Sequence, residues 1–360
     1  MNIRGGLYRM EITNEIKCVV WDLDHTLWDG ILTESDEVVL KPGIVDVIKT
    51  LDRRGILHSI SSKNNYEHAI NKLKEFQLDE YFLYPEINWN AKSHSIKQIQ
   101  ENLNIGMDSL LFVDDQEFEL DEVKSIHPDI HCIHSDKYIE LLDHQMLKPR
   151  FITVDSGRRR EMYQSEYRRK REEEAYQGPT EAFLATLNMK FSIYPAKEED
   201  LKRAEELTVR TNQLNATGLT FSYDELNKLR TSKDHQLLIC ELKDIYGSYG
   251  KIGLALIHMK DDAWVLEMLL MSCRVASRGV GTVLLLYIMK EAKKNRKRLY
   301  ANFRDTGRNR MMNISFRFAG FEEKEVVSKD QYILEHPLED IHDYPDYIDV
   351  VIYKGTQVNT

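Results

Sequence analysis

Asp22 and Asp24, with Thr26 close behind them, are the residues of this sequence best suited to chemistry. They directly follow a short apolar run, residues 19–21, which predicts a buried strand. Side chains two residues apart on a strand point to the same side, so the two carboxylates should share a face. Because like charges held together repel each other, we expect a cation between them, most simply Mg²⁺. A solvated, Asp-rich turn is the alternative, which the preceding strand and Thr26 disfavour.

Polar side chains stand in similar places elsewhere in the first third of the chain. They are Ser61, Ser62 and Asn64 after the apolar residues 56–60, Asp114 and Asp115 after residues 110–113, and Lys92 between these two groups. Hydroxyls can bind phosphate oxygens, a lysine can neutralise a charged intermediate, and paired acids can hold a metal. Together with the first acid pair, they suffice for phosphoryl transfer through an aspartyl-phosphate.

In these residues the chain resembles the haloacid dehalogenase (HAD) superfamily of phosphatases. The stretch from Asp22 to Thr26 is similar to the first HAD motif, and Ser62, Lys92 and the Asp114–Asp115 pair are similar to the second, third and fourth. The resemblance implies that Asp22 is the nucleophile and Asp24 the general acid/base. It also implies that Asp22, the Asp24 carbonyl and Asp114 hold Mg²⁺, with Ser62 and Lys92 completing the catalytic set. We expect substrate or phosphate to contact Thr26, Ser61, Asn64 and Asp115.

The order of elements around these residues predicts a parallel sheet covered by helices. Apolar, strand-like runs at residues 17–21, 56–60, 81–85, 109–113 and 130–133 alternate with helical patterns, for example at residues 43–54 and 66–77. Ligands bind beyond the carboxyl ends of the strands in such sheets, which is where the acids fall. The short gaps between the motifs leave no room for a large cap domain.

A chain of 360 residues predicts two domains. A charged helical stretch at residues 158–174, with opposite charges at helical spacing, favours a solvated linking helix; an arginine-rich docking surface is the alternative. We therefore expect an N-terminal segment (1–14), a HAD-like domain (15–150), a charged linker (151–187), a second domain (188–325) and a C-terminal tail (326–360).

The second domain carries a glycine-containing loop, Arg278-Gly279-Val280-Gly281, before an apolar helix at residues 282–294. Such a loop can cradle a phosphate against the helix N-terminus, although an ordinary helix-entry turn has the same sequence. Set between strands at 263–271 and 299–303, it resembles the GNAT acyltransferase fold. That fold would bind the pyrophosphate of a pantetheine group at Arg278, Gly279 and Gly281. Phe316 departs from the pattern, because many GNAT enzymes have a proton-donating Tyr there.

The two halves together resemble the FkbH-like proteins, which are HAD subfamily IIIC enzymes of polyketide and hybrid peptide–polyketide pathways. The matching stretches are residues 20–30, 62–65, 112–116, 210–217 and 271–274. The resemblance implies that the glyceryl unit of 1,3-bisphosphoglycerate loses phosphate and is loaded onto the phosphopantetheine arm of an acyl carrier protein. Within the stretch 210–217, Asn212, Gln213 and Asn215 are suited to hydrogen-bonding a small polyol, whereas a simple turn after a helix is the alternative.

The residue that carries the acyl group is left open by the sequence. Many FkbH-like relatives have a cysteine where this chain has Ser61, which cannot form a thioester. Cys273 is an alternative nucleophile, although an isolated cysteine is more commonly a buried structural residue. Direct transfer to the carrier thiol would need no cysteine of the enzyme.

Composition limits the partners. A formal net charge of −10 argues against nucleic acid or an anionic membrane surface as a partner. We expect a cytoplasmic protein, because no apolar run approaches a bilayer span and no signal-peptide pattern opens the chain. Two other functions stay open: a plain Mg²⁺-dependent phosphatase with a non-catalytic docking domain, and a non-catalytic scaffold that binds a carrier protein.

Overall fold

The computed structural model describes residues 15–35, 37–149 and 151–353. These residues form two compact units, which divide between Tyr167 and Arg168. The expected N-terminal segment, 1–14, lies outside the described residues. No helix in the described ranges combines the length and the apolar character that crossing a membrane requires.

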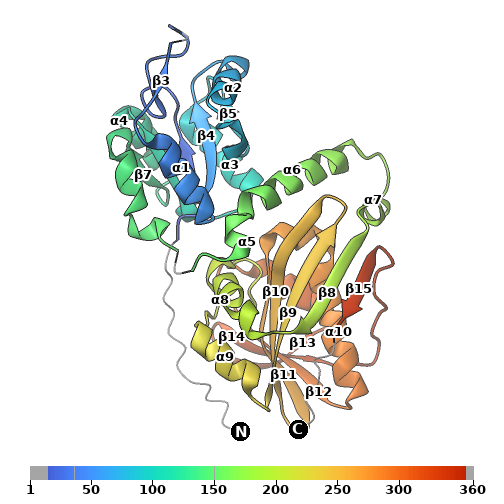
Figure 1. Cartoon of the computed structure of the whole chain (residues 1–360). Helices are drawn as coiled ribbons and strands as arrows, with labels where there is room; N and C mark the ends of the chain where they lie inside the picture. Colours follow the sequence, from blue (N-terminus) through green and yellow to red (C-terminus); the bar gives the residue numbers. More distant parts are fainter. Residues whose placement is uncertain (1–14, 36, 150, 354–360) are drawn as a thin grey trace. The chain divides into compact units, whose positions relative to one another are not determined.

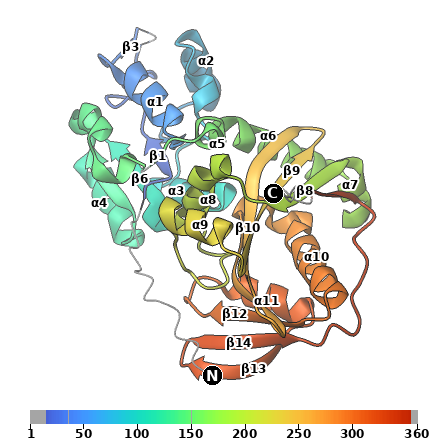
Figure 2. The same ribbon diagram turned by 60° about the horizontal axis from the view of Figure 1, so that its bottom comes forward.

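The first unit is built on a parallel sheet in which β1 occupies the centre. Strands β4, β5 and β7 of this sheet are labelled in Figure 1, and β1 and β6 in Figure 2. The strand order is β5-β4-β1-β6-β7, and β1 pairs with β4 on one side and β6 on the other. The elements are β1 (Cys18–Trp21), β2 (Trp28–Asp29), β3 (Val39–Leu40), α1 (Ile44–Arg53), β4 (Leu57–Ser62), α2 (Tyr66–Glu75), β5 (Glu86–Ile87), α3 (Lys92–Leu103), β6 (Leu110–Asp114), α4 (Glu117–Ile126), β7 (His131–His134) and α5 (Val154–Gly157).

Strand β1 is apolar throughout because helices cover both faces of its sheet. Val19 and Trp21 pack in one core with residues of α1 and α2, and Cys18 and Val20 pack in another with residues of α3 and α4. All four side chains are fully buried. Burying a large aliphatic side chain stabilises a fold by about 1.5–3 kcal/mol, so these alternating contacts fix the strand and hence the place where it ends.

The second unit is built on a larger sheet of mixed direction. Its strand order is β13-β14-β12-β11-β10-β9-β8-β15, and Figure 2 shows β14 and β13 continuing the sheet beyond β12. The elements are α7 (Thr180–Thr186), β8 (Met189–Pro195), α8 (Leu201–Arg210), α9 (Tyr223–Thr231), β9 (His235–Asp244), β10 (Gly247–Met259), β11 (Ala263–Met271), α10 (Val280–Lys294), β12 (Arg298–Arg304), α11 (Arg310–Phe318), β13 (Glu322–Ser328), β14 (Gln331–His336) and β15 (Ile348–Ile352).

Both faces of this sheet are covered. Leu201, Leu207 and Leu226 of α8 and α9 pack on one face, and the buried stripe of α10 packs on the other together with Phe183 of α7 and Phe316 of α11. The expected fold class, a HAD-like parallel sheet followed by a GNAT-like α+β domain, is confirmed.

Helix α6 (Arg159–Ala175) contributes to both units. In the first, Arg160 Nε lies 3.1 Å from Asp52 Oδ1. In the second, Arg169 binds the carboxylate of Asp244 through two nitrogens, at 2.6 and 2.8 Å, and its guanidinium lies 3.8 Å from the ring centroid of Tyr249. The charged stretch is therefore a helix, but two of its arginines are largely or fully buried ion-pair partners instead of solvated groups.

Two features differ from the sequence expectations. The strand expected at residues 81–85 is wrong: the short 3₁₀ helix Asp79–Tyr81 includes its first residue, Phe82 forms only an isolated bridge to His58 of β4, and Tyr84 has a φ of 48°. The strand that pairs with β4 is β5, which follows these residues. The segment from 326 onward, expected as a tail, supplies part of β13 and all of β14 and β15. Every residue of β13 is exposed, so the alternation that marks a half-buried strand is missing there.

Candidate active site

The candidate active site lies at the carboxyl ends of three adjacent strands of the first unit. Trp21, the last residue of β1, is in register with Ile60 of β4 and Val113 of β6. Asp22, Ser61 and Asp114 each follow one of these residues. Because parallel strands end at the same edge, the sheet brings residues from distant parts of the chain together there.

Three carboxylates form a cluster at this edge. One oxygen from each of Asp22, Asp114 and Asp115 lies within 4.8 Å of the others. Lys92, the first residue of α3, donates from Nζ to Asp22 Oδ1 at 2.5 Å and to Asp114 Oδ2 at 2.7 Å. Lys92, Asp22 and Asp114 are all at most 6% exposed. The structure thus brings together four residues that the sequence analysis assigned to the site.

The three carboxylates of this cluster carry more negative charge than the Lys92 ammonium can neutralise. Burial, followed by repulsion from Asp22, raises the pKa of Asp114 to about 6 despite the nearby Lys92 ammonium. The same two causes raise the pKa of Asp115. Burial alone would lower the pKa of Lys92, but the carboxylates of Asp22 and Asp114 outweigh it and raise that pKa. Oxygen-only donors with excess negative charge fit a hard divalent cation such as Mg²⁺.

Asp24 is held in place by its own set of donors. Its Oδ1 accepts hydrogen bonds from Trp28 Nε1 at 2.8 Å and from the Leu32 amide at 3.1 Å. Its Oδ2 accepts one from Asn64 Nδ2 at 3.0 Å. Burial nevertheless raises the pKa of Asp24, against the lowering effect of the Trp28 and Leu32 hydrogen bonds. A carboxyl held so firmly, with a raised pKa, is suited to proton transfer.

These contacts give Asn64 and Trp28 a role that the sequence did not indicate. Asn64, expected to bind phosphate, orients the Asp24 carboxylate. Trp28, whose indole the sequence analysis did not connect with Asp24, is fully buried and orients the same group. The i to i+4 spacing of Asp24 and Trp28 in a turn was the available clue, since Trp N–H needs an acceptor when buried.

Buried hydroxyls accompany the acids. Thr26 Oγ1 and Ser61 Oγ are buried and have no hydrogen-bond partner among the described residues. Ser62, at the end of β4, is 3% exposed. An unpaired buried hydroxyl costs roughly 1–3 kcal/mol, a cost that a bound polar group can remove.

The N-terminus of α3, which carries Lys92, is fastened by residues that the sequence analysis missed. The Glu122 side chain accepts from the Ser93 amide at 3.1 Å and from Ser93 Oγ at 2.5 Å. His127 Nε2 lies 2.9 Å from the Ser93 carbonyl oxygen, so this nitrogen carries the proton and donates it. No local pattern links residues this far apart in the chain, so only the fold reveals them.

The glycine loop of the second unit has the expected backbone conformation, but its arginine binds a different group from the one expected. Gly279 caps α10 with a φ of 74°, and a Cβ there would lie 2.8 Å from Tyr347 Oη. A Cβ on Gly281 would meet no described atom within 4 Å. Arg278, however, is 1% exposed and forms an ion pair with Glu173 at 3.0 Å. The side chain expected to bind pantetheine is thus engaged within its own unit.

The remaining predicted residues of the second unit are placed as follows. Cys273 is half-buried at the start of a 3₁₀ helix (Cys273–Arg278), and Phe316 is fully buried against Phe321 at a centroid distance of 5.2 Å. Asn215 is buried and its Oδ1 accepts from the amides of Thr217 and Gly218, so it stabilises its own loop. Asn212 and Gln213 are exposed and stay predictions.

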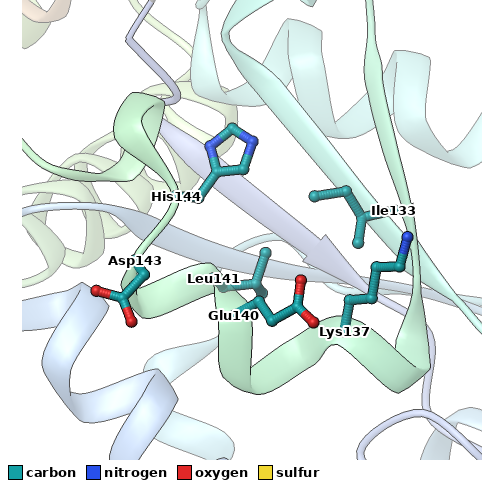
Figure 3. A pocket seen from close by; sticks show the side chains of 6 residues that line it. All are labelled: Ile133, Lys137, Glu140, Leu141, Asp143 and His144. Carbon is teal, nitrogen blue, oxygen red and sulfur yellow. The ribbon is translucent and has the colours of Figure 1, made fainter.

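A hollow of about 350 Å³ lies elsewhere in the first unit (Figure 3). Its lining consists of Ile133, Lys137, Glu140, Leu141, Asp143 and His144. None of the predicted site residues lines it, so it is separate from the acidic cluster.

Comparison with known proteins finds similarity to phosphatases and to acetyltransferases. No family model matches the chain. Magnesium-dependent phosphatase 1 of Homo sapiens is 27% identical over 137 residues, which cover 33% of this chain and 77% of that protein. A Mg-complexed crystal structure of the N-terminal, phosphatase-containing part of a Bacteroides fragilis protein is 28% identical, with a TM-score of 0.30, over 37% of this chain and 40% of that one. The match thus spans less than half of that structure's chain.

The second unit has its own neighbours. The PaiA N-acetyltransferase of Thermoplasma acidophilum, solved with coenzyme A, matches 41% of this chain and 98% of its own, at 16% identity and a TM-score of 0.34. The chain is thus similar to two kinds of protein, a magnesium-dependent phosphatase and an N-acetyltransferase.

Proposed function

We propose that this protein is a Mg²⁺-dependent HAD-type phosphatase that also transfers an acyl group, loading a glyceryl unit onto an acyl carrier protein. The observation that carries the phosphatase part is the buried cluster of Asp22, Asp114 and Asp115 bridged by Lys92. The likeness to a magnesium-dependent phosphatase supports it. The acyl transfer rests on the GNAT-like fold of the second unit and on the resemblance to FkbH-like proteins.

The proposed reaction has two parts. In the first, the carrier thiol attacks the acyl carbon of a 1,3-bisphosphoglycerate-like substrate, the C–O bond to the acyl phosphate breaks, and inorganic phosphate leaves with the proton of the thiol. In the second, an Asp22 carboxylate oxygen attacks the phosphorus of the remaining phosphate ester. The bond between this phosphorus and the ester oxygen of the glyceryl unit breaks. Asp24 donates a proton to the departing alcohol and then takes one from the water that hydrolyses the aspartyl-phosphate.

The residues around Asp22 prepare this second part. Lys92 holds the nucleophile and offsets charge that builds on the phosphoryl oxygens, and the hydroxyls of Thr26, Ser61 and Ser62 are donors for those oxygens. Asp22, Asp114 and Asp115 are the side chains that would hold Mg²⁺, which when bound supplies charge stabilisation to the phosphoryl group.

A plain phosphatase with a docking domain is the second candidate. The observations that favour it are the ion pair that engages Arg278 and the buried, hydroxyl-free ring of Phe316. Both make the second unit less like an ordinary acetyl-transferring enzyme.

Mass spectrometry of a carrier protein separates these functions. Purified holo-carrier is incubated with the chain, Mg²⁺ and 1,3-bisphosphoglycerate, with chelator as the control. A glyceryl mass on the pantetheine arm supports the main proposal, and free phosphate without acylated carrier supports the plain phosphatase. Neither product supports a scaffold. A Cys273→Ala variant that loads carrier at the wild-type rate would show that no enzyme-bound thioester forms there.

A further inference from the structure

A cluster of two histidines and a glutamate lies on the sheet of the second unit. His235, His258 and Glu267 belong to β9, β10 and β11, which are neighbours in the sheet (Figure 1). One ligand atom from each lies within 4.8 Å of the others. None of these residues takes part in the proposed phosphatase or transfer chemistry.

The backbone explains how three strands present these side chains together. His258 is the direct cross-strand partner of His235. The pairing of β10 with β11 shifts between Leu256 and Ile257, which pair with Met268 and Leu266, so Glu267 is an extra residue without its own partner. Such a bulge re-aims a side chain, and here the Glu267 carboxylate meets both imidazoles.

The distances fit metal coordination. Glu267 Oε1 lies 3.2 Å from His258 Nδ1, and Glu267 Oε2 lies 3.7 Å from His235 Nε2. Ligands bound to Zn²⁺ at about 2.0–2.1 Å in a tetrahedron are separated by roughly 3.3–3.4 Å along its edges. The two histidine–carboxylate separations are therefore close to such an edge before any ion is added.

The proton positions fit as well. His235 Nδ1 lies 3.1 Å from Ser232 Oγ, which can accept its proton and leave the Nε2 lone pair toward Glu267. Metal-binding histidines commonly use their second nitrogen in this way. The two rings stack at a centroid distance of 4.4 Å, which brings two titratable rings together beside one carboxylate.

We propose that His235, His258 and Glu267 form a transition-metal site, distinct from the acidic cluster of the first unit, that takes Zn²⁺. Two imidazole nitrogens and a carboxylate oxygen suit Zn²⁺ and not Mg²⁺, which prefers oxygen ligands alone. The side chains are 18–29% exposed, so a fourth position is open to water. A bound ion would tie together three consecutive strands of the sheet.

The test is a Zn²⁺ titration by calorimetry in excess Mg²⁺, which occupies the acidic cluster. We expect one Zn²⁺ per chain, with the affinity reduced more than about tenfold in His258→Asn and in Glu267→Gln. His342→Asn, which removes an exposed histidine outside the cluster, is the matched control and should bind as wild type. Co²⁺ as the probe should give the visible absorption of a tetrahedral site in wild type and not in the two variants.

Thermal melts in chelator show whether each variant is folded. If His258→Asn does not fold, Glu267→Gln alone still tests the proposal. The proposal is overturned if wild type takes up no Zn²⁺ in excess Mg²⁺. It is overturned equally if the folded ligand variants bind Zn²⁺ as tightly as His342→Asn. Since the readout is metal binding alone, it is independent of whether the chain loads a carrier.

Discussion

Lys92 is the residue on which the candidate site depends most. It is the cation between two buried carboxylates, Asp22 and Asp114, and it stands where charge on a phosphoryl group would need to be offset. The single side chain therefore contributes both to stability and to the proposed chemistry, and the two contributions can be measured separately.

Asp22→Asn should abolish phosphate release from a phosphate monoester, because an amide is a far weaker nucleophile than a carboxylate. Colorimetric detection of inorganic phosphate with Mg²⁺ present is the measurement. The exposed neighbour Asp29, changed to Asn, is a suitable control and should turn over normally. Unchanged turnover in Asp22→Asn would refute the assignment of the nucleophile.

Lys92→Met should lower the free energy of unfolding in chelator by about 3–5 kcal/mol, since two buried carboxylates lose their partner. Mg²⁺ should restore more stability to this variant than to wild type, as measured by urea denaturation with and without the ion. Lys63→Met is the control: Lys63 pairs with Glu119 at 2.6 Å but is 39% exposed, so about 1 kcal/mol or less is expected. Equal losses in the two variants would contradict the buried role of Lys92.

At the scale of elements, a contact from the middle of α4 fixes the start of α3 and so places Lys92. The two carboxylate oxygens of Glu122 accept from the Ser93 amide and from the Ser93 hydroxyl. Glu122→Gln leaves only one acceptor oxygen for these two donors. We expect phosphate release to fall by about tenfold to 10²-fold, because small displacements of a catalytic group are costly. Glu117→Gln, on the exposed first turn of the same helix, should have little effect. Steady-state kinetics of both variants provide the comparison.

Strand β4 carries a buried pH-sensitive contact. Trp21 Nε1 donates to His58 Nδ1 at 3.0 Å, so His58 Nε2 carries the proton that it shares with the Ile48 carbonyl at 3.1 Å. Burial lowers the pKa of His58 from 6.5 to about 4. The unfolded chain therefore binds more protons between these values, and the stability that neutral His58 allows is lost as the pH falls from 6.5 toward 4.

The expected loss over that window is roughly 3 kcal/mol. Denaturant unfolding at several pH values should show it in wild type, and a His58→Gln variant should lack this component. Stability curves of wild type and variant that run parallel from pH 7 to pH 4 would rule out His58 as the cause.

The sequence was sufficient to predict the elements that have a clear residue pattern and insufficient to predict the others. Strands β1 and β6 are continuous apolar runs that end in polar residues, and Ile56, Leu57 and Ile60 indicate β4, so both the sheet and the placing of the acids were predictable. Helix α9 was missed although Ser222 and Glu225 form a capping box at its start. The Trp28 donor to Asp24 could have been inferred from its spacing, but the Asn64 and Glu122 contacts could not be predicted, since they depend on tertiary approach.

At the scale of the whole molecule, the two proposed steps predict a trapped product. In Asp22→Asn the carrier thiol can still displace the acyl phosphate, but the second phosphate cannot be removed. The carrier should therefore gain a phosphoglyceryl mass, about 80 Da above the glyceryl mass left by wild type. A carrier that gains no mass from this variant would show that dephosphorylation must come first.

Helix α6 decides how the chain can be divided into recombinant fragments. A fragment that begins at residue 188 would lack Arg169, whose guanidinium neutralises the buried Asp244. A fragment that ends at residue 150 would lack Arg159 and Arg160, which bind the Gly55 carbonyl and Asp52. Fragments that each carry their own copy of residues 159–175 keep all of these contacts, so overlapping ends, and not abutting ones, are the sound design for assaying the halves apart.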